Sequence, residues 1–230
     1  MNNDYGYLSS DRVRTQSNLI QKVYGWMAAA LVVTGVTSYV VAGNQTIQNL
    51  LFSNPWFTWG LFFIQLGLVI ILSARVMKMS VGAASAMFVV YSFVTGIVLS
   101  LLFTLYTKES LATTFFITAA LFGVMTLYGW TTKKDLTSAG SLFFMGLVGV
   151  IIASVVNIFL KSTVLYWITT YIGVFIFVGL IAYDTQKLKQ LAGMETSDNS
   201  SKLAVIGALS LYLDFINLFL LLLRIFGRRN

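Results

Sequence analysis

The chain has 230 residues, of which 57% are hydrophobic and only 10% are charged, and its mean hydropathy is +0.82. This composition lies far outside that of soluble globular domains, so the sequence predicts an integral membrane protein. The formal charge is +7, but the basic residues are scattered singly between apolar segments. That distribution indicates membrane anchors and topology signals and argues against nucleic-acid binding.

The sequence contains neither cysteine nor histidine. Their absence excludes disulfides, thiol nucleophiles, haem and iron–sulfur ligation through these residues, and histidine-based acid–base catalysis. We therefore expect no cofactor and no enzyme activity, and any chemistry would have to depend on carboxylates, Arg, Lys, Tyr, Ser or Thr. With one proline and no alternation of about ten residues typical of barrel strands, the backbone is predicted to form an all-α bundle.

In chain order, residues 1–19 are predicted to be a short, disordered cytoplasmic tail without a signal peptide, and residues 20–230 a single transmembrane domain. Apolar stretches of about twenty residues, the length that crosses a bilayer, predict seven helices. These lie at 20–42, 55–74, 81–106, 110–131, 138–160, 163–187 and 202–226. Pro55 suits the first turn of the second helix, and the loop from 188 to 201 is the longest and most polar.

Lysine and arginine are distributed unevenly between the loops, which predicts the orientation. Ten basic residues lie in the N-terminal segment up to Lys22 and in the loops that follow the second, fourth and sixth predicted helices. The loops that follow the first, third and fifth helices carry only Lys108 and Lys161. The N-terminus is therefore expected in the cytoplasm. Three arginines depart from the pattern, because seven spans place them outside: Arg224, Arg228 and Arg229. The alternative is a re-entrant segment 202–226, and we favour seven spans.

Small residues recur every four positions in two of the predicted helices, and such spacing favours close helix packing. The two sets are Ser92, Gly96 and Ser100, and Gly149, Ala153 and Asn157. We assign them no chemistry.

Asp184 and Asp214 are the only acidic residues inside or at the edge of the predicted helices. A charge in hydrocarbon costs several kcal/mol unless it is paired, hydrated or protonated, so an acid there indicates a functional site. Asp214 belongs to a polar stripe on the last helix, formed by Gly207, Ser210, Asp214 and Asn217 at spacings of three and four. Because the remaining surface of that helix is apolar, we expect it to be central, with the stripe facing other helices or water.

Arg75 and Asp184 are predicted to lie at the same cytoplasmic side, so both can meet Asp214. A guanidinium matches a carboxylate and stays charged. Two structural alternatives stay open, namely that Arg75 is a snorkelling anchor and that Asp184 pairs with Lys187, three residues further on. No basic residue lies within a turn of Asp214, so its partner must come from another helix.

At these residues the sequence resembles the Bax inhibitor-1 family (transmembrane Bax inhibitor motif proteins), most closely its bacterial inner-membrane branch. The resemblance rests on GLIAYDTQKL (179–188) and LYLDFINLFLLLLRIFG (211–227), supported by LVIILSARVMKMS (68–80), YSFVTGIVLS (91–100) and QKVYGWM (21–27). It implies seven helices with the last one central, a pH-sensitive calcium leak, and a hydrogen-bonded pair of Asp184 and Asp214 latched by Arg75.

One position departs from the family pattern. Many members carry a glutamate in an E-x-G-L motif where this chain has Gln65. A neutral amide does not bind a cation or a proton as a glutamate does. Gln65 is therefore grouped with Ser210 and Asn217 as a candidate pathway-lining residue, not as a ligand.

The leading functional prediction is a passive, proton-gated cation leak through the inner membrane. Asp184 and Asp214 would be weak, transient Ca²⁺ ligands, and Ca²⁺, protons and the lipid bilayer the partners. One alternative is a regulator of a membrane protease or respiratory complex, in which the aspartates only lock the bundle. A less favoured alternative is an intramembrane aspartyl protease, suggested by the pair Tyr183-Asp184. Those enzymes carry a Gly-x-Gly-Asp motif, however, whereas Leu213 precedes Asp214.

Overall fold

The computed structural model of the chain describes residues 3–194 and 200–230. Within these residues the chain is helical apart from short connections and contains no β-strand. Seven of the described helical segments are long and apolar enough to cross a membrane: Ser17–Ala42, Pro55–Lys78, Val81–Leu105, Lys108–Thr131, Thr137–Leu160, Thr163–Ala192 and Ser200–Phe226. The predicted all-α fold with seven spans is thus confirmed.

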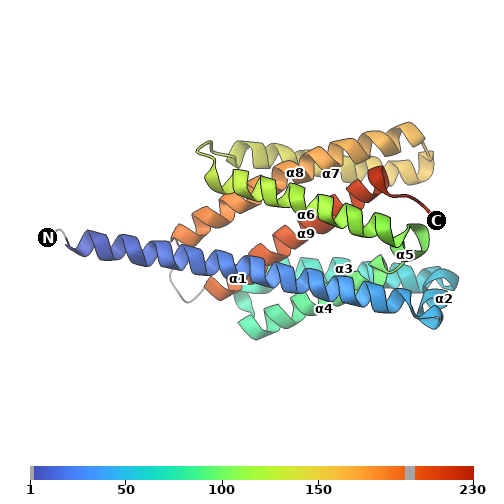
Figure 1. Cartoon of the computed structure of the whole chain (residues 1–230), viewed down its shortest axis with the longest axis horizontal. Coiled ribbons are helices and arrows are strands. Elements are labelled where there is room, and N and C mark those ends of the chain that lie inside the picture. The colour runs from blue at the N-terminus through green and yellow to red at the C-terminus, as the bar shows by residue number, and fades with distance from the viewer. Residues whose placement is uncertain (1–2, 195–199) are drawn as a thin grey trace. The chain divides into compact units, whose positions relative to one another are not determined.

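Nine α-helices and one 3-10 turn make up the described chain (Figure 1). They are α1 (Asn3–Ala42), α2 (Gln45–Ser53), α3 (Pro55–Arg75), the 3-10 turn η1 (Val76–Lys78), α4 (Val81–Leu99), α5 (Leu102–Leu105), α6 (Lys108–Thr131), α7 (Thr137–Leu160), α8 (Thr163–Met194) and α9 (Ser200–Phe226). Side-chain caps explain where several begin. Asn44 and Asn54 each accept a hydrogen bond from the backbone N–H three residues on, at the starts of α2 and α3, and Pro55 occupies the first turn of α3 as predicted.

Three differences from the sequence prediction concern the polar segments. The N-terminal segment, expected to be a disordered tail, is helical from Asn3 onwards, because extending an existing helix adds one hydrogen bond for each residue fixed. The short helix α2 fills the first loop. Helix α8 continues to Met194, so that only residues 195–199 of the predicted loop 188–201 lie outside the described residues.

The helices form two compact units. The first contains the chain up to Thr107, residues 190–212 and the last two residues, and the second contains Lys108–Lys189 and Leu213–Arg228. Helix α9 thus contributes to both. It is also the most buried span, with 61% of its apolar window buried against at most 39% in any other, as predicted for a central helix.

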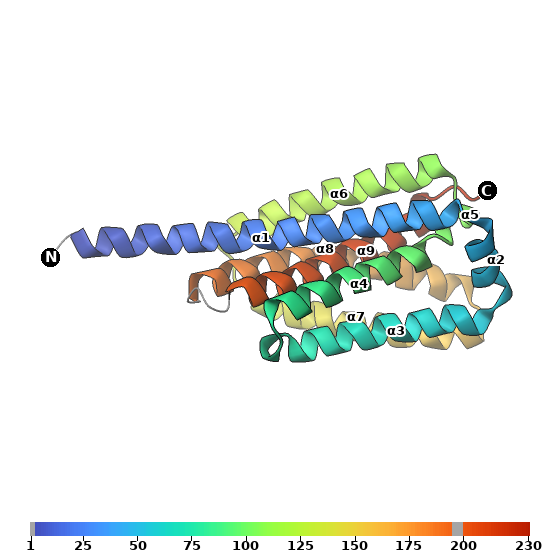
Figure 2. The same cartoon turned by 90° about the horizontal axis from the view of Figure 1, so that it is seen from below.

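In the first unit, α1 and α3 both pack against α4 (Figure 2). The approach of α1 and α4 is close, because a Cβ added to Gly96 would lie 2.7 Å from the carbonyl oxygen of Thr34. Tyr212 of α9 is fully buried in this unit. Its hydroxyl hydrogen-bonds the Thr34 hydroxyl at 2.7 Å, and its ring meets Phe88 and Tyr91 edge to face. These contacts fix the N-terminal half of α9.

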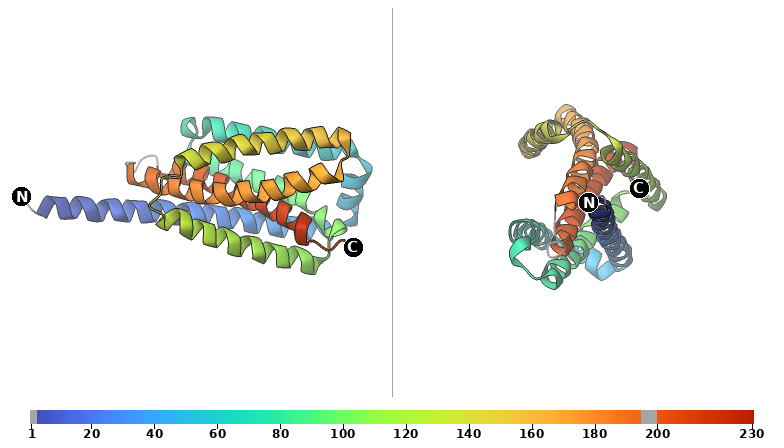
Figure 3. Two further views of the ribbon diagram at one scale, coloured as in Figure 1. Left: turned by 90° about the horizontal axis from the view of Figure 1, so that it is seen from above. Right: turned by 90° about the vertical axis from the view of Figure 1, so that its left-hand side faces the viewer.

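The second unit contains α6, α7, most of α8 and the C-terminal half of α9 (Figure 3). Helices α6 and α8 nearly touch, since a Cβ on Gly129 would overlap the carbonyl oxygen of Ala182. Helix α7, by contrast, has Gly140 as its one buried residue in the described structure. Among the described atoms nothing lies within 4 Å of a Cβ built on Gly149. The packing expected for the Gly96 set is therefore observed at Gly96, and none is observed at Gly149.

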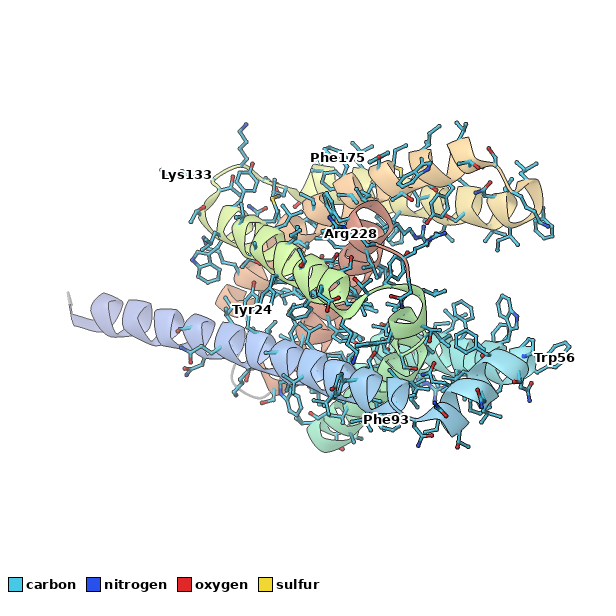
Figure 4. The ribbon with its side chains drawn as sticks, turned by 45° about the vertical axis from the view of Figure 1, so that its right-hand side comes forward. Tyr24, Trp56, Phe93, Lys133, Phe175 and Arg228 are labelled. Atoms are coloured by element: carbon cyan, nitrogen blue, oxygen red, sulfur yellow. The ribbon has the colours of Figure 1, made fainter. Side chains whose placement is uncertain are left out.

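Aromatic side chains stand out from the helices, as expected where lipid is the surrounding solvent. Trp56 and Phe93 of the first unit and Phe175 of the second all project outwards (Figure 4), and Trp56 is 85% exposed. Trp in particular is enriched at the membrane interface.

The C-terminus lies at the α5 end of the first unit. The backbone N–H of Asn230 donates to the carbonyl oxygen of Leu105 at 3.2 Å, so the chain ends beside the connection between the third and fourth spans. A re-entrant α9 would return to the side of its own start. The observed position therefore supports seven crossings, with the three C-terminal arginines at the end opposite the start of α9.

Candidate functional site

The structure brings Asp184 and Asp214 together. Both belong to the second unit, Asp184 on α8 and Asp214 on α9, and their carboxyl groups are near enough to interact as like charges. Asp214 is only 6% exposed, whereas Asp184 is half-buried. We call these two residues the aspartate pair.

Aromatic packing on both sides of Asp214 sets the rotation of α9. Tyr212 is anchored in the first unit through Thr34. In the second unit, the ring of Phe215 packs edge to face on Phe115 and Phe122 of α6, at 5.4 and 5.6 Å between centroids. Asp214 lies between these two anchors in sequence, so its side chain has little freedom to leave the interior.

One oxygen of Asp214 has no hydrogen-bond partner among the residues that the structure describes. Its Oδ2 atom is buried and unpartnered among the described residues. Burying a polar atom without a partner is costly, and burying an ionised group without one costs more. The position therefore suits a group that takes up a proton or a cation.

The residues that follow Asp184 fasten α8 to the connection between α6 and α7. The Gln186 side chain accepts from the Leu136 N–H and donates to the Lys134 carbonyl, each at 2.8 Å. The Lys189 ammonium donates to the Trp130 carbonyl at 2.7 Å and lies 5.1 Å from the centre of that indole ring. We call these contacts the α8 clamp. They hold the segment carrying Asp184 in a fixed register against α6.

Two further lysines near the α8 clamp, Lys187 and Lys133, do not take part in its hydrogen bonds as described. The Lys187 ammonium, considered above as a partner of Asp184, lies over the Tyr183 ring at 5.8 Å from its centre. Lys133 projects from the connection between α6 and α7 (Figure 4) and is exposed.

Asp135, in the same connection, differs from the aspartate pair. It is fully exposed, and the hydroxyl and backbone N–H of Thr137 both donate to its carboxylate, at 2.6 and 2.9 Å. The hydroxyl first, and then the N–H, lower the pKa of Asp135 below its usual range. This acid therefore stays ionised at any pH near neutrality.

The other candidate residues are distributed over the two units. Arg75 ends α3 in the first unit with an exposed side chain, so its role as a latch stays a prediction. Gln65, also in the first unit, donates to the Thr95 hydroxyl at 3.0 Å. Ser210 lies in the first unit and Asn217 in the second, where the Asn217 amide donates to the Leu213 carbonyl at 2.8 Å.

Four residues that position the site were not singled out from the sequence: Thr34, Tyr212, Gln186 and Lys189. Tyr212 and Gln186 each lie two residues from an aspartate of the pair, which was a usable signal. Thr34 carried none, because a threonine in an apolar helix commonly bonds its own backbone.

The fold and the site define a multi-pass helical membrane protein with a pair of aspartates on its last two helices. The chain belongs to the family described as inhibitor of apoptosis-promoting Bax1, whose model matches residues 16–230.

Relatives of similar length support this assignment. The chain is 51% identical over 212 residues to the inner membrane protein YbhL of Escherichia coli, covering 91% of each chain. It is 44% identical to an uncharacterised protein of Borreliella burgdorferi, covering 94% of each chain. It is also 34% identical over the full length of both chains to an uncharacterised membrane protein of Streptococcus pyogenes serotype M1.

Proposed function

We propose that this protein is a pH-sensitive cation leak of a bacterial inner membrane, with the aspartate pair as its proton sensor. The proposal is supported by two acids of one helical unit whose charges interact, one of them buried with an oxygen that lacks a hydrogen-bond partner among the described residues. Acids in such positions are expensive to bury and mark ion and proton pathways. The relationship to an inner membrane protein agrees with the proposed location.

The chemistry of the pair supplies a pH response. Two carboxylates at short range repel each other, so they take up protons as a coupled unit. The ionised pair attracts a divalent cation, and the fully protonated pair does not. Protonation thus lowers the affinity of the pair for the permeant ion. It also weakens the proposed attraction between the pair and Arg75, which would hold the leak closed.

Calcium is the cation that these ligands suit best, because it binds hard oxygen atoms from carboxylates, amides and hydroxyls. The described side chains contain no group of three or more Asp, Glu, His or Cys residues placed to hold a metal ion. Two carboxylates with few helpers suit brief binding, and conduction requires that the ion leaves again.

The test is Ca²⁺ entry into dye-loaded liposomes that contain only this protein, measured from about pH 5 to pH 8, on both sides of neutrality. We expect the flux to rise from alkaline to mildly acidic pH, as protonation loosens the closed state, and to fall in stronger acid, as the pair loses its charge. Protein-free liposomes give the baseline. Absence of protein-dependent flux at every pH would refute the leak and favour a regulator of a membrane protease or respiratory complex.

A further prediction concerns Arg75 as a latch at the predicted cytoplasmic side. Arg75→Ala is expected to raise the basal leak near neutral pH, because the closed state loses an ion pair to the aspartates. An exposed pair contributes up to about 1 kcal/mol, which corresponds to roughly a fivefold change in population. The matched control is Lys78→Ala, which removes another exposed cation three residues further on. Equal flux in both variants and wild type would show that Arg75 is only an anchor.

A further inference from the structure

The last residues of the chain are docked beside the connection between α5 and α6. We call residues 227–230 the C-terminal strap. Its Arg228 N–H donates to the Ser110 hydroxyl at 2.8 Å, and Arg229 pairs with Tyr106 as an antiparallel bridge. Tyr106 and Ser110 are both buried.

Asn230 completes the docking. Its side-chain amide nitrogen lies 3.2 to 3.4 Å from the carbonyl oxygens of Phe103, Thr104 and Tyr106, which share its two N–H donors, and its backbone N–H donates to Leu105. These carbonyls lie at the end of α5, where the helix itself leaves acceptors unsatisfied. Asn230 thus provides hydrogen-bond donors for the carbonyl oxygens of four consecutive residues, 103–106.

The strap holds α5. Between α4 and α5 the regular helical hydrogen bonding is interrupted, and we call this interruption the break. At Ser100 and Leu101 the helical hydrogen bonds shift from four residues back to three, with Leu101 donating to Val98 and Phe103 to Ser100. Bonds of this tighter type have poorer geometry. The break is thus a place where α5 can change direction relative to α4.

On its other side, α5 is held by α2. The buried Gln48 donates to the Ser100 hydroxyl at 2.9 Å and accepts from the Thr104 hydroxyl at 3.4 Å. The α5 turn therefore lies between two fasteners, Gln48 and the strap.

Docking also accounts for the arginines that depart from the positive-inside pattern. The backbone bonds of the strap keep Arg228 and Arg229 beside the connection between the third and fourth spans, whatever side their charges would favour. Both side chains are exposed.

We propose that the C-terminal strap is a second gate of the leak, which must undock before α5 can swing about the break at Ser100 and Leu101. What the gate controls rests on the proposed leak, whereas the docking of the strap does not depend on the leak. The docking and the gating can therefore be tested by two separate measurements.

The first measurement is hydrogen exchange of the backbone amides of residues 101–107 in the full-length protein in detergent. Asn230→Ala removes the side-chain hydrogen bonds to these carbonyl oxygens, and we expect exchange of the amides of residues 101–107 to accelerate by about tenfold, the effect of losing hydrogen bonds that oppose local opening. The matched control is Arg229→Gln, because Arg229 pairs through its backbone. Unchanged exchange in Asn230→Ala would overturn the docking.

The second measurement locks the strap. The chain has no cysteine, so Tyr106→Cys with Arg229→Cys introduces one defined pair. Residues opposite each other in an antiparallel bridge are about 4.5–5.5 Å apart at Cα, within the span of a disulfide. We expect oxidation to reduce the Ca²⁺ leak at its optimal pH and reduction to restore it, with no redox effect in either single-cysteine variant.

The outcomes are distinguishable. Asn230→Ala leaves the buried Tyr106 in place, unlike the cysteine variants. In Asn230→Ala we expect faster amide exchange together with a Ca²⁺ leak that is raised several-fold and keeps its pH profile. Faster exchange with an unchanged leak would refute the gate and leave a purely structural strap. A wild-type protein without any leak would remove the proposed function and the gate together, and the exchange rates would still decide whether the strap is docked.

Discussion

Replacing either member of the aspartate pair by asparagine is expected to flatten the pH profile of the leak. Asparagine keeps the size of the side chain but cannot titrate. In Asp184→Asn or Asp214→Asn the remaining acid has lost its neighbouring charge, so the coupled uptake of protons disappears. We expect the ratio of the flux at the acidic optimum to the flux at pH 8 to fall to about one in both variants.

Asp135→Asn is the matched control for these variants. It removes one carboxylate of the second unit that is fully exposed and whose pKa is already lowered by Thr137. That group does not change its charge across the tested range, so the control should keep the wild-type profile. If both pair variants also kept it, the aspartates would be structural and the sensor would have to lie elsewhere.

The second large effect concerns Gly129, where α6 and α8 meet. A Cβ at this position would overlap the carbonyl oxygen of Ala182 and lie 2.9 Å from its Cα atom. These atoms belong to the backbone of α8 and cannot turn aside as a side chain could. We expect Gly129→Ala to destabilise the protein by about 3 kcal/mol, the upper end for overpacking a core. The measurement is thermal unfolding in detergent, followed by tryptophan fluorescence.

Gly123→Ala provides the comparison on the same helix. Nothing in the described structure lies within 4 Å of a Cβ built there, and alanine is the better helix former by about 1 kcal/mol. This variant should be as stable as the wild type or more so. Equal stability of the two variants would show that α6 and α8 do not approach as closely as described.

The spans and the aspartates were predictable because each depends on one local property. Hydropathy places the helices, since backbone polar groups in lipid must bond within their own segment. Asp184 and Asp214 stand out because acids in apolar helices are rare. Their meeting on consecutive antiparallel helices follows from the short connection between α8 and α9.

The positioning contacts were not predictable in this way, because they join residues far apart in sequence. Thr34 and Tyr212 are separated by 178 positions, and Asn230 bonds Tyr106 across 124. No periodicity connects such residues. The α8 clamp was missed for a related reason, since Gln186 and Lys189 bond to backbone carbonyls that every residue carries.

The division of α9 between the two units has a consequence for biosynthesis. Synthesis and membrane insertion proceed from the N-terminus, so α9 leaves the ribosome after the other six described spans. Until it arrives, Thr34, Phe88 and Tyr91 lack the Tyr212 side chain that packs between them, and Phe115 and Phe122 lack Phe215. A nascent chain that stopped before Ser200 would carry six of the seven spans with neither unit complete. The packing of both units therefore waits for α9, and membrane quality-control proteases would encounter a chain truncated before α9 as an unfinished protein.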